Sequence, residues 1–122
     1  MRRGSAFSAR LEGQSDLFTI PTTGGAPKRL TKDPSDDHTP SYSHDGRWIY
    51  FSSMRSGRWE IWKTPAEGGE ATQVTRSEGS YMPMESPDGT TLYYCHKLPE
   101  KGIWKMPVLG GEGVQVTGPT DR

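Results

Sequence analysis

Two residues able to move protons stand side by side in the first third of the chain. Asp37 precedes His38, and an imidazole beside a carboxylate can exchange a proton or bind a ligand near neutral pH. The corresponding positions in the second half of the chain hold Ser80 and Tyr81, whose hydroxyls can donate or accept hydrogen bonds. These four are the candidate ligand-binding residues. The alternative interpretation is a solvent-exposed loop.

Cys95 and His96 form a second pair of reactive residue types. A cysteine near a histidine can act as a nucleophile or a metal ligand, but neighbours on a strand point to opposite faces. The single cysteine excludes an intrachain disulfide and a cysteine-rich zinc site. No nucleophile elbow or phosphate-binding loop motif is present. The sequence therefore predicts no catalytic residue, no metal site and no cofactor.

Asp45 and Asp88 are carboxylates that could be imagined as acids or metal ligands. Each is followed by glycine, and Asp-Gly is a strong hairpin signal because glycine supplies the positive φ that the turn requires. Aspartate side chains also bind their own backbone in such turns. We interpret both residues as structural.

Aromatic residues recur at one position, occupied by Phe18, Trp62 and Trp104. A row of aromatics can stack on sugars or bases, but the regular spacing favours core packing. Trp59 has no aromatic counterpart and lies near Arg55. It could form a cation–π or ligand patch, although a solvated loop is the favoured interpretation.

Internal repeats organise all of these residues. The segments Asp16–Pro21, Glu60–Pro65 and Gly102–Pro107 follow one another at offsets of 44 and 42 residues. Each is followed by a diglycine and then by an aliphatic residue and a threonine. A further block, Pro40–Gly46, returns as Pro83–Gly89 after 43 residues.

One repeat contains four short strands, expected around residues 40–43, 47–53, 59–64 and 71–75. Four strands in roughly 40–45 residues is typical of a β-propeller blade; the alternative, a β-sandwich, does not require similar units at fixed spacing. No helix is expected. The sequence predicts an all-β fold with three blades, approximately 1–35, 36–78 and 79–122. The first lacks its innermost strand, so the array is a partial or half propeller.

The repeated pattern, Pro-x-x-Ser-x-Asp-Gly, a strand, aliphatic-aromatic-x-x-Pro, Gly-Gly and aliphatic-Thr, resembles the WD40-like PD40 repeats of TolB-type propellers. The resemblance covers almost the whole chain, through Pro40–Thr75, Pro83–Thr117 and part of residues 5–31. It implies a bacterial protein, suggests a periplasmic location, and carries no catalytic residue. Ligands of propellers gather at the central channel, so Asp37, His38, Ser80 and Tyr81 are expected in loops at its mouth.

Charge and hydropathy exclude several classes of protein. The 122 residues contain 15 basic and 15 acidic side chains, so nothing indicates nucleic-acid binding. No apolar run approaches the ~20 residues of a membrane helix, and no signal peptide is expected at the first residues.

Three blades cannot close a ring, and an open array exposes apolar faces and strand edges that favour association. We therefore expect a homo-oligomer, preferably a homodimer with six blades, or a protein or peptide partner. The predicted function is a non-enzymatic scaffold or binding module. The alternatives are a propeller fragment of a larger hydrolase or lyase, and a sensor module of a bacterial regulator or kinase.

Overall fold

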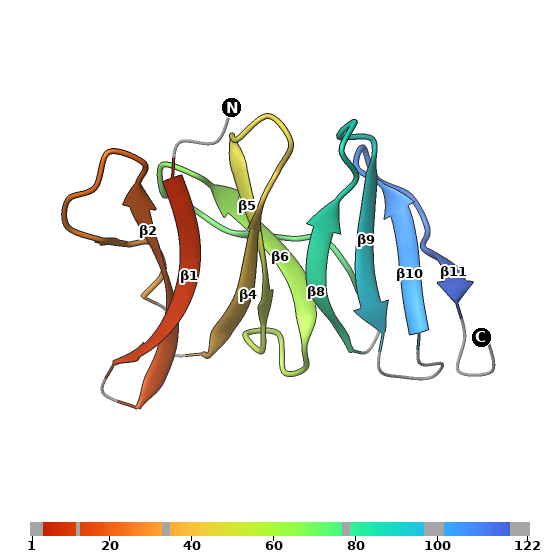
Figure 1. The fold of residues 1–122 in the computed structure, drawn as a ribbon. Coiled ribbons are helices and arrows are strands. Elements are labelled where there is room, and N and C mark those ends of the chain that lie inside the picture. The colour runs from red at the N-terminus through yellow and green to blue at the C-terminus, as the bar shows by residue number, and fades with distance from the viewer. Residues whose placement is uncertain (1–3, 12, 33–34, 77–78, 97–101, 118–122) are drawn as a thin grey trace.

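Three antiparallel sheets follow one another along the chain (Figure 1). The computed structural model describes residues 4–11, 13–32, 35–76, 79–96 and 102–117, and this part contains strands and no helix. The predicted all-β fold is therefore confirmed. The ends of the predicted blade ranges, residues 1–3 and 118–122, lie outside the described residues.

The strands pair mainly with their neighbours in sequence. The first sheet has the order β1 (Gly4–Leu11), β2 (Gln14–Pro21), β3 (Lys28–Arg29). The second has the order β4 (Asp37–Tyr42), β5 (Trp48–Ser53), β6 (Glu60–Pro65), β7 (Thr72–Gln73). The third contains β8 (Ser80–Glu85), β9 (Thr91–His96), β10 (Gly102–Pro107) and β11 (Val114–Thr117).

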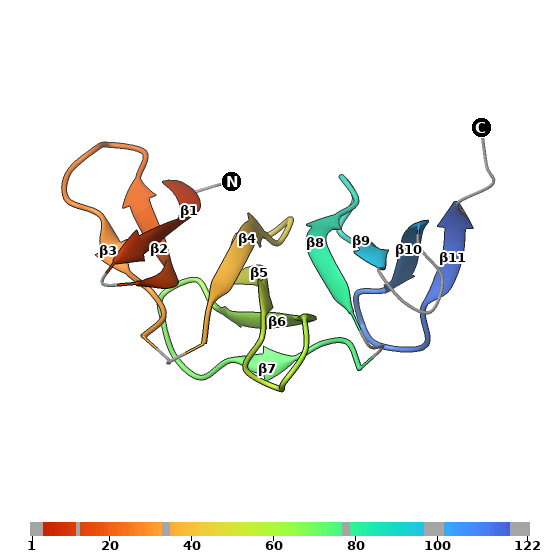
Figure 2. The ribbon, with the colours of Figure 1, turned by 90° about the horizontal axis from the view of Figure 1, so that it is seen from below.

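The three sheets spread like a fan from a common inner side (Figure 2). Strands β1, β4 and β8 lie on that side, while β3, β7 and β11 lie on the outside. The first and third sheets extend in opposite directions, with the second between them. This is the arrangement of consecutive propeller blades. In Figure 2, no other described element covers the side that β1, β4 and β8 face.

Short polar side chains close the hairpin between β4 and β5. The Ser43 hydroxyl donates to the Asp45 carboxylate at 2.8 Å, and the same carboxylate oxygen accepts the backbone N–H of Arg47 at 3.0 Å. Gly46 has a φ of 76°, a conformation that glycine adopts without steric cost. The turn at residues 86–89 has the same contacts. The structural interpretation of the Asp-Gly pairs is therefore confirmed.

The threonine after the diglycine holds the outer part of the first and second blades. The Thr31 hydroxyl accepts the backbone N–H of Leu17 at 3.0 Å. In the second sheet, Thr75 accepts the N–H of Ile61 at 2.9 Å and donates to the buried Glu60 carboxylate at 2.6 Å. The hydroxyl thus extends the ladder beyond the short strands β3 and β7, which explains why the aliphatic-threonine pair repeats.

The hydrophobic core lies between the sheets. One cluster joins the first and second sheets through buried Leu17, Ile49 and Phe51, with Trp62 packed against them. A second cluster joins the second and third sheets. Its buried members are Tyr50, Ile61, Leu92, Tyr94 and Met106, with Trp104 packed against them. The tryptophans therefore pack between blades, as their spacing predicted.

Candidate functional site

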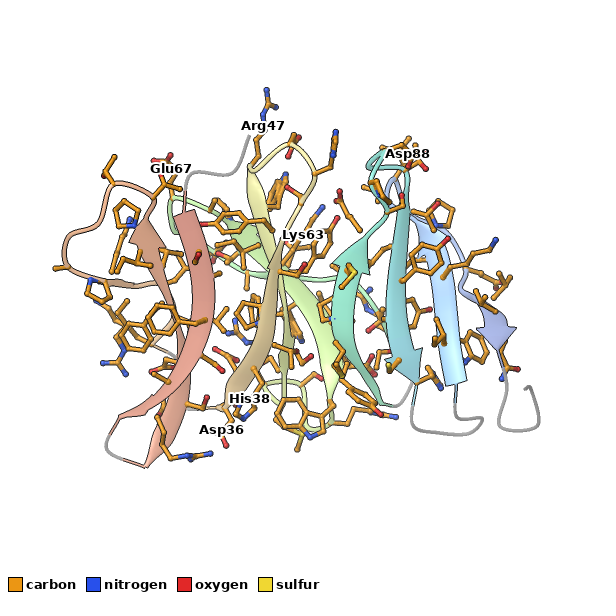
Figure 3. The ribbon with its side chains drawn as sticks, in the orientation of Figure 1. Asp36, His38, Arg47, Lys63, Glu67 and Asp88 are labelled. Carbon is orange, nitrogen blue, oxygen red and sulfur yellow. The ribbon has the colours of Figure 1, made fainter. Side chains whose placement is uncertain are left out.

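A mostly apolar hollow of about 300 Å³ opens beside the inner strands of the second and third sheets. Its lining residues are His38, Thr39, Ser52, Trp59 and Tyr81. Figure 3 shows His38 at one end of the sheets with Asp36, whereas Arg47 and Asp88 lie at the opposite end. The hollow is therefore on the rim away from the Asp-Gly turns.

An aromatic pair forms one wall of the hollow. The His38 and Trp59 rings have centroids 5.5 Å apart with planes at 48°. Nδ1 of His38 lies 3.3 Å from the Ser15 hydroxyl, which also donates to the backbone carbonyl of Asp37 at 3.0 Å. Contacts from the first sheet therefore orient a side chain of the second.

A bulge in β4 and another in β8 shape the hollow. The pairing register shifts after His38 in β4 and after Tyr81 in β8, where Thr39 and Met82 have φ values of 51° and 58°. Positive φ is uncommon for residues other than glycine, and a bulge re-aims the neighbouring side chains. The same distortion thus recurs in both blades beside the two predicted site residues.

The Ser52 hydroxyl connects the two bulges. Its oxygen lies 2.6 Å from the Thr39 hydroxyl and accepts the backbone N–H of Met82 at 3.0 Å. The Thr39 hydroxyl donates its hydrogen to the carbonyl of His38 at 2.8 Å, so the arrangement suits donation from Ser52 to Thr39. These bonds fasten the second blade to the third at the hollow.

Asp37 lies in the interior and not in the wall of the hollow. Its side chain is fully buried, and its carboxylate forms an ion pair with the Arg55 guanidinium at 3.1 Å. That guanidinium also lies 5.1 Å from the centroids of the Phe51 and Trp62 rings. The cation–π contact considered from the sequence therefore exists, but with these two rings and not with Trp59. The Arg55 cation offsets the cost of burying the Asp37 charge.

Ser80 is also buried, and its backbone N–H donates to the carbonyl of Trp59 at 3.0 Å. This bond fixes the chain just before β6, where Trp59 reaches the hollow. Of the four predicted residues, His38 and Tyr81 line the hollow, while Asp37 and Ser80 lie outside its lining.

The four residues were expected in loops, and that placement was wrong. Asp37 pairs with Ser53, and Ser80 with His96, so both dipeptides belong to the first positions of β4 and β8. The inner strands begin earlier than predicted because pairing continues on the far side of each bulge.

Three lining residues were missed or misjudged. Trp59 was assigned to a solvated loop. It is an aromatic residue without an aromatic counterpart in the other repeats, and this departure is the signal that could have identified it as a site residue. Ser52 and Thr39 carry no such signal, because serine and threonine are common in strands and turns and only tertiary packing brings these two together.

The other reactive pair is divided by the sheet. His96 is buried and its ring packs on Trp104 with centroids 4.8 Å apart, while Cys95 is half-buried. Their strand positions alternate, as expected. In the described ranges, no group of three or more His, Cys, Asp or Glu side chains is placed to hold a metal ion. The same ranges contain no helix suited to crossing a membrane.

A family model for the TolB beta propeller domain, PD40, matches residues 3–119. The chain belongs to this family. An uncharacterised protein of Agrobacterium fabrum is 35% identical to the PD40 chain over 80 residues, which is 65% of this chain and 27% of that protein. The Tol-Pal system protein TolB of Bordetella pertussis is 39% identical over 58 residues, or 47% of this chain and 13% of that protein.

The fold is similar to that of a protein described as TolB from Agrobacterium tumefaciens. The TM-score is 0.88 at 24% identity, over 95% of this chain and 46% of that chain. The PD40 chain thus spans less than half of each of these relatives, and the expected partial propeller is confirmed. The PD40 pattern itself lies in turns and inter-blade packing, whereas Trp59 of the hollow stands outside it.

Proposed function

We propose that this PD40 chain is a non-enzymatic binding scaffold whose hollow takes one apolar or aromatic side chain of a protein or peptide. The supporting observation is the aromatic wall of His38 and Trp59 beside an apolar space of about 300 Å³. That volume is at the lower end of the range for small-molecule pockets, so it suits a single side chain. Rings bind other rings in offset or tilted contacts.

Selection from a phage-displayed random peptide library tests this proposal. Peptides selected on the wild-type chain are expected to bind Trp59→Ala at least tenfold more weakly, because the substitution removes one wall. Trp48→Ala is the matched control. Trp48 is also half-buried, but it lies at the end of β5 away from Ser52 and the hollow. It forms a cation–π contact with Lys63, whose Nζ is 4.5 Å from the ring centroid.

Circular dichroism must show that both variants remain folded. A library that yields no wild-type binder, or binders that are equally sensitive to both substitutions, would contradict the proposal. Loss confined to Trp59→Ala supports the hollow as the binding site.

We also propose that the chain associates with a second copy, since three blades leave a propeller open. A periplasmic location is proposed from the resemblance to TolB-type proteins. The alternative function, a propeller fragment of a larger hydrolase or lyase or a sensor module, is favoured if the natural reading frame encodes an adjoining catalytic, kinase or DNA-binding domain.

A further inference from the structure

The first and third blades carry exposed apolar residues on the faces that point away from the second blade. On the third blade, Tyr93, Ile103 and Val116 are 37%, 42% and 44% exposed, and we call these three residues the tail face. On the first blade, the Phe7 and Phe18 rings stack with centroids 5.7 Å apart, and we call this pair the head face. Phe7 is 36% exposed.

The tail face corresponds to positions that are buried in the preceding blades. Ile103 pairs with Cys95 in the third sheet as Ile61 pairs with Ser52 in the second and Leu17 with Ser8 in the first. Leu17 and Ile61 are fully buried. A position that is buried wherever another blade follows becomes exposed at the third blade.

The head face shows the converse. Phe7 pairs with Phe18 as Phe51 pairs with Trp62 and Tyr94 with Trp104. Phe51 and Tyr94 are 0% and 4% exposed. The ring at this position is buried wherever another blade precedes it, and it is exposed only at the first blade.

Both junctions within the chain join these same positions. Leu17 belongs to one cluster with Phe51 and Trp62. Ile61 belongs to the next cluster with Tyr94 and Trp104. The series continues with Ile103, and the rings that match the earlier pairs are Phe7 and Phe18. The chain therefore carries on its first blade the surface that its third blade lacks.

We infer that the tail face of one copy packs against the head face of a second copy, and the reverse, to form a closed pair. This inference rests on the self-association proposed above and specifies its surfaces. Because the first and third sheets extend in opposite directions (Figure 2), a twofold rotation places the second copy on the uncovered side. Two identical junctions then close a ring of six blades, and no apolar end is left for filament growth.

Light scattering coupled to size-exclusion chromatography tests the surfaces. The wild-type chain is expected at twice its mass of 13.6 kDa. Ile103→Asp places a charge in both junctions and is expected to raise the dimer dissociation constant at least tenfold. Leu109→Asp is the matched control, because Leu109 is a fully exposed aliphatic residue in the β10–β11 hairpin, away from the tail face.

A mixing experiment distinguishes head-to-tail pairing from other dimers. Phe7→Asp damages the head face, so this variant and Ile103→Asp are each expected to be weak dimers alone. Their equimolar mixture contains one junction with two intact faces, and it is expected to dimerise at least tenfold more tightly than either variant. If Phe7→Asp loses its native circular dichroism spectrum, Phe18→Ser replaces it.

The outcomes separate this inference from the proposed self-association. A monomer at every concentration up to the millimolar range overturns both. A stable dimer that neither variant weakens, or that only one variant weakens, leaves self-association and overturns the head-to-tail surfaces. Weakening by both variants, with recovery on mixing, supports the closed pair.

Discussion

At the scale of single residues, short polar side chains close the turns between strands. Asp88 accepts hydrogen bonds from the Ser86 hydroxyl at 2.7 Å, the Thr90 hydroxyl at 2.8 Å and the Thr90 N–H at 3.1 Å. These donors favour the ionised carboxylate and lower the pKa of Asp88 to about 2. Asp45 has a similar environment in the preceding blade, where the backbone N–H of Arg47 and the Ser43 hydroxyl lower its pKa.

The lowered pKa values predict a loss of stability in acid. The folded state holds the proton less tightly than the unfolded state, so the stabilisation is complete above the ordinary pKa of 3.8 and is lost as pH falls toward 2. The melting temperature should therefore decrease between pH 4 and pH 2. Asp88→Asn should be less stable at pH 6 but show a shallower decrease, and parallel acid profiles for the two proteins would contradict this account.

At the scale of elements, each blade depends on hairpins whose geometry is set by glycine. Gly89 has a φ of 75°, and a Cβ at this position would lie 3.0 Å from the Cβ of His44 in the second blade. The turn between β8 and β9 therefore has two constraints, one on its backbone and one on the space beside the neighbouring blade.

Gly89→Val is expected to lower the free energy of unfolding by about 1–3 kcal/mol, because a β-branched residue is strained at positive φ and its Cβ would also press on the Cβ of His44. Gly24→Val is the control, since Gly24 has a φ of 89° but no atom within 4 Å of its added Cβ. Chemical denaturation should show the smaller loss for Gly24→Val. An unchanged midpoint for Gly89→Val would refute the turn assignment.

At the scale of the whole molecule, contacts between blades hold the array together. The Glu85 carboxylate in β8 accepts the Tyr50 hydroxyl at 2.7 Å and the backbone N–H of His44 at 2.7 Å. Burial and the hydrogen bond from Tyr50 to Glu85 raise the pKa of the Tyr50 phenol above its usual value of 10. One carboxylate thus fastens the third blade to both the sheet and the turn of the second.

Tyr50→Phe is expected to destabilise the chain by about 1–2 kcal/mol, since a hydrogen bond to a charged acceptor is lost while the ring is kept. Tyr93→Phe is the matched control, because Tyr93 occupies the corresponding position of the third blade and is 37% exposed. Urea unfolding of both variants, measured where the chain is monomeric, provides the comparison. Equal midpoints would show that the Glu85 bond contributes little.

The sequence alone determined the hairpin turns, the blade repeat and most of the strands. Asp45–Gly46 and Asp88–Gly89 act through contacts within a few residues, and the regular positions of Trp62 and Trp104 follow from the repeat itself. Such signals are local or periodic, so they can be recognised in the sequence itself. They also placed His38 and Tyr81 in equivalent positions, although not the strand pairing that begins at Asp37 and Ser80.

Only the tertiary structure decided which of these residues remain accessible. Asp37 is buried and pairs with Arg55, which follows β5, and Trp59 meets His38 beside the bulge in β4. Leu17, Ile61 and Ile103 occupy one repeat position, yet the first two are buried and the third is exposed. The difference is set by whether another blade packs against that face, and this is a property of neighbours in space that no local pattern contains.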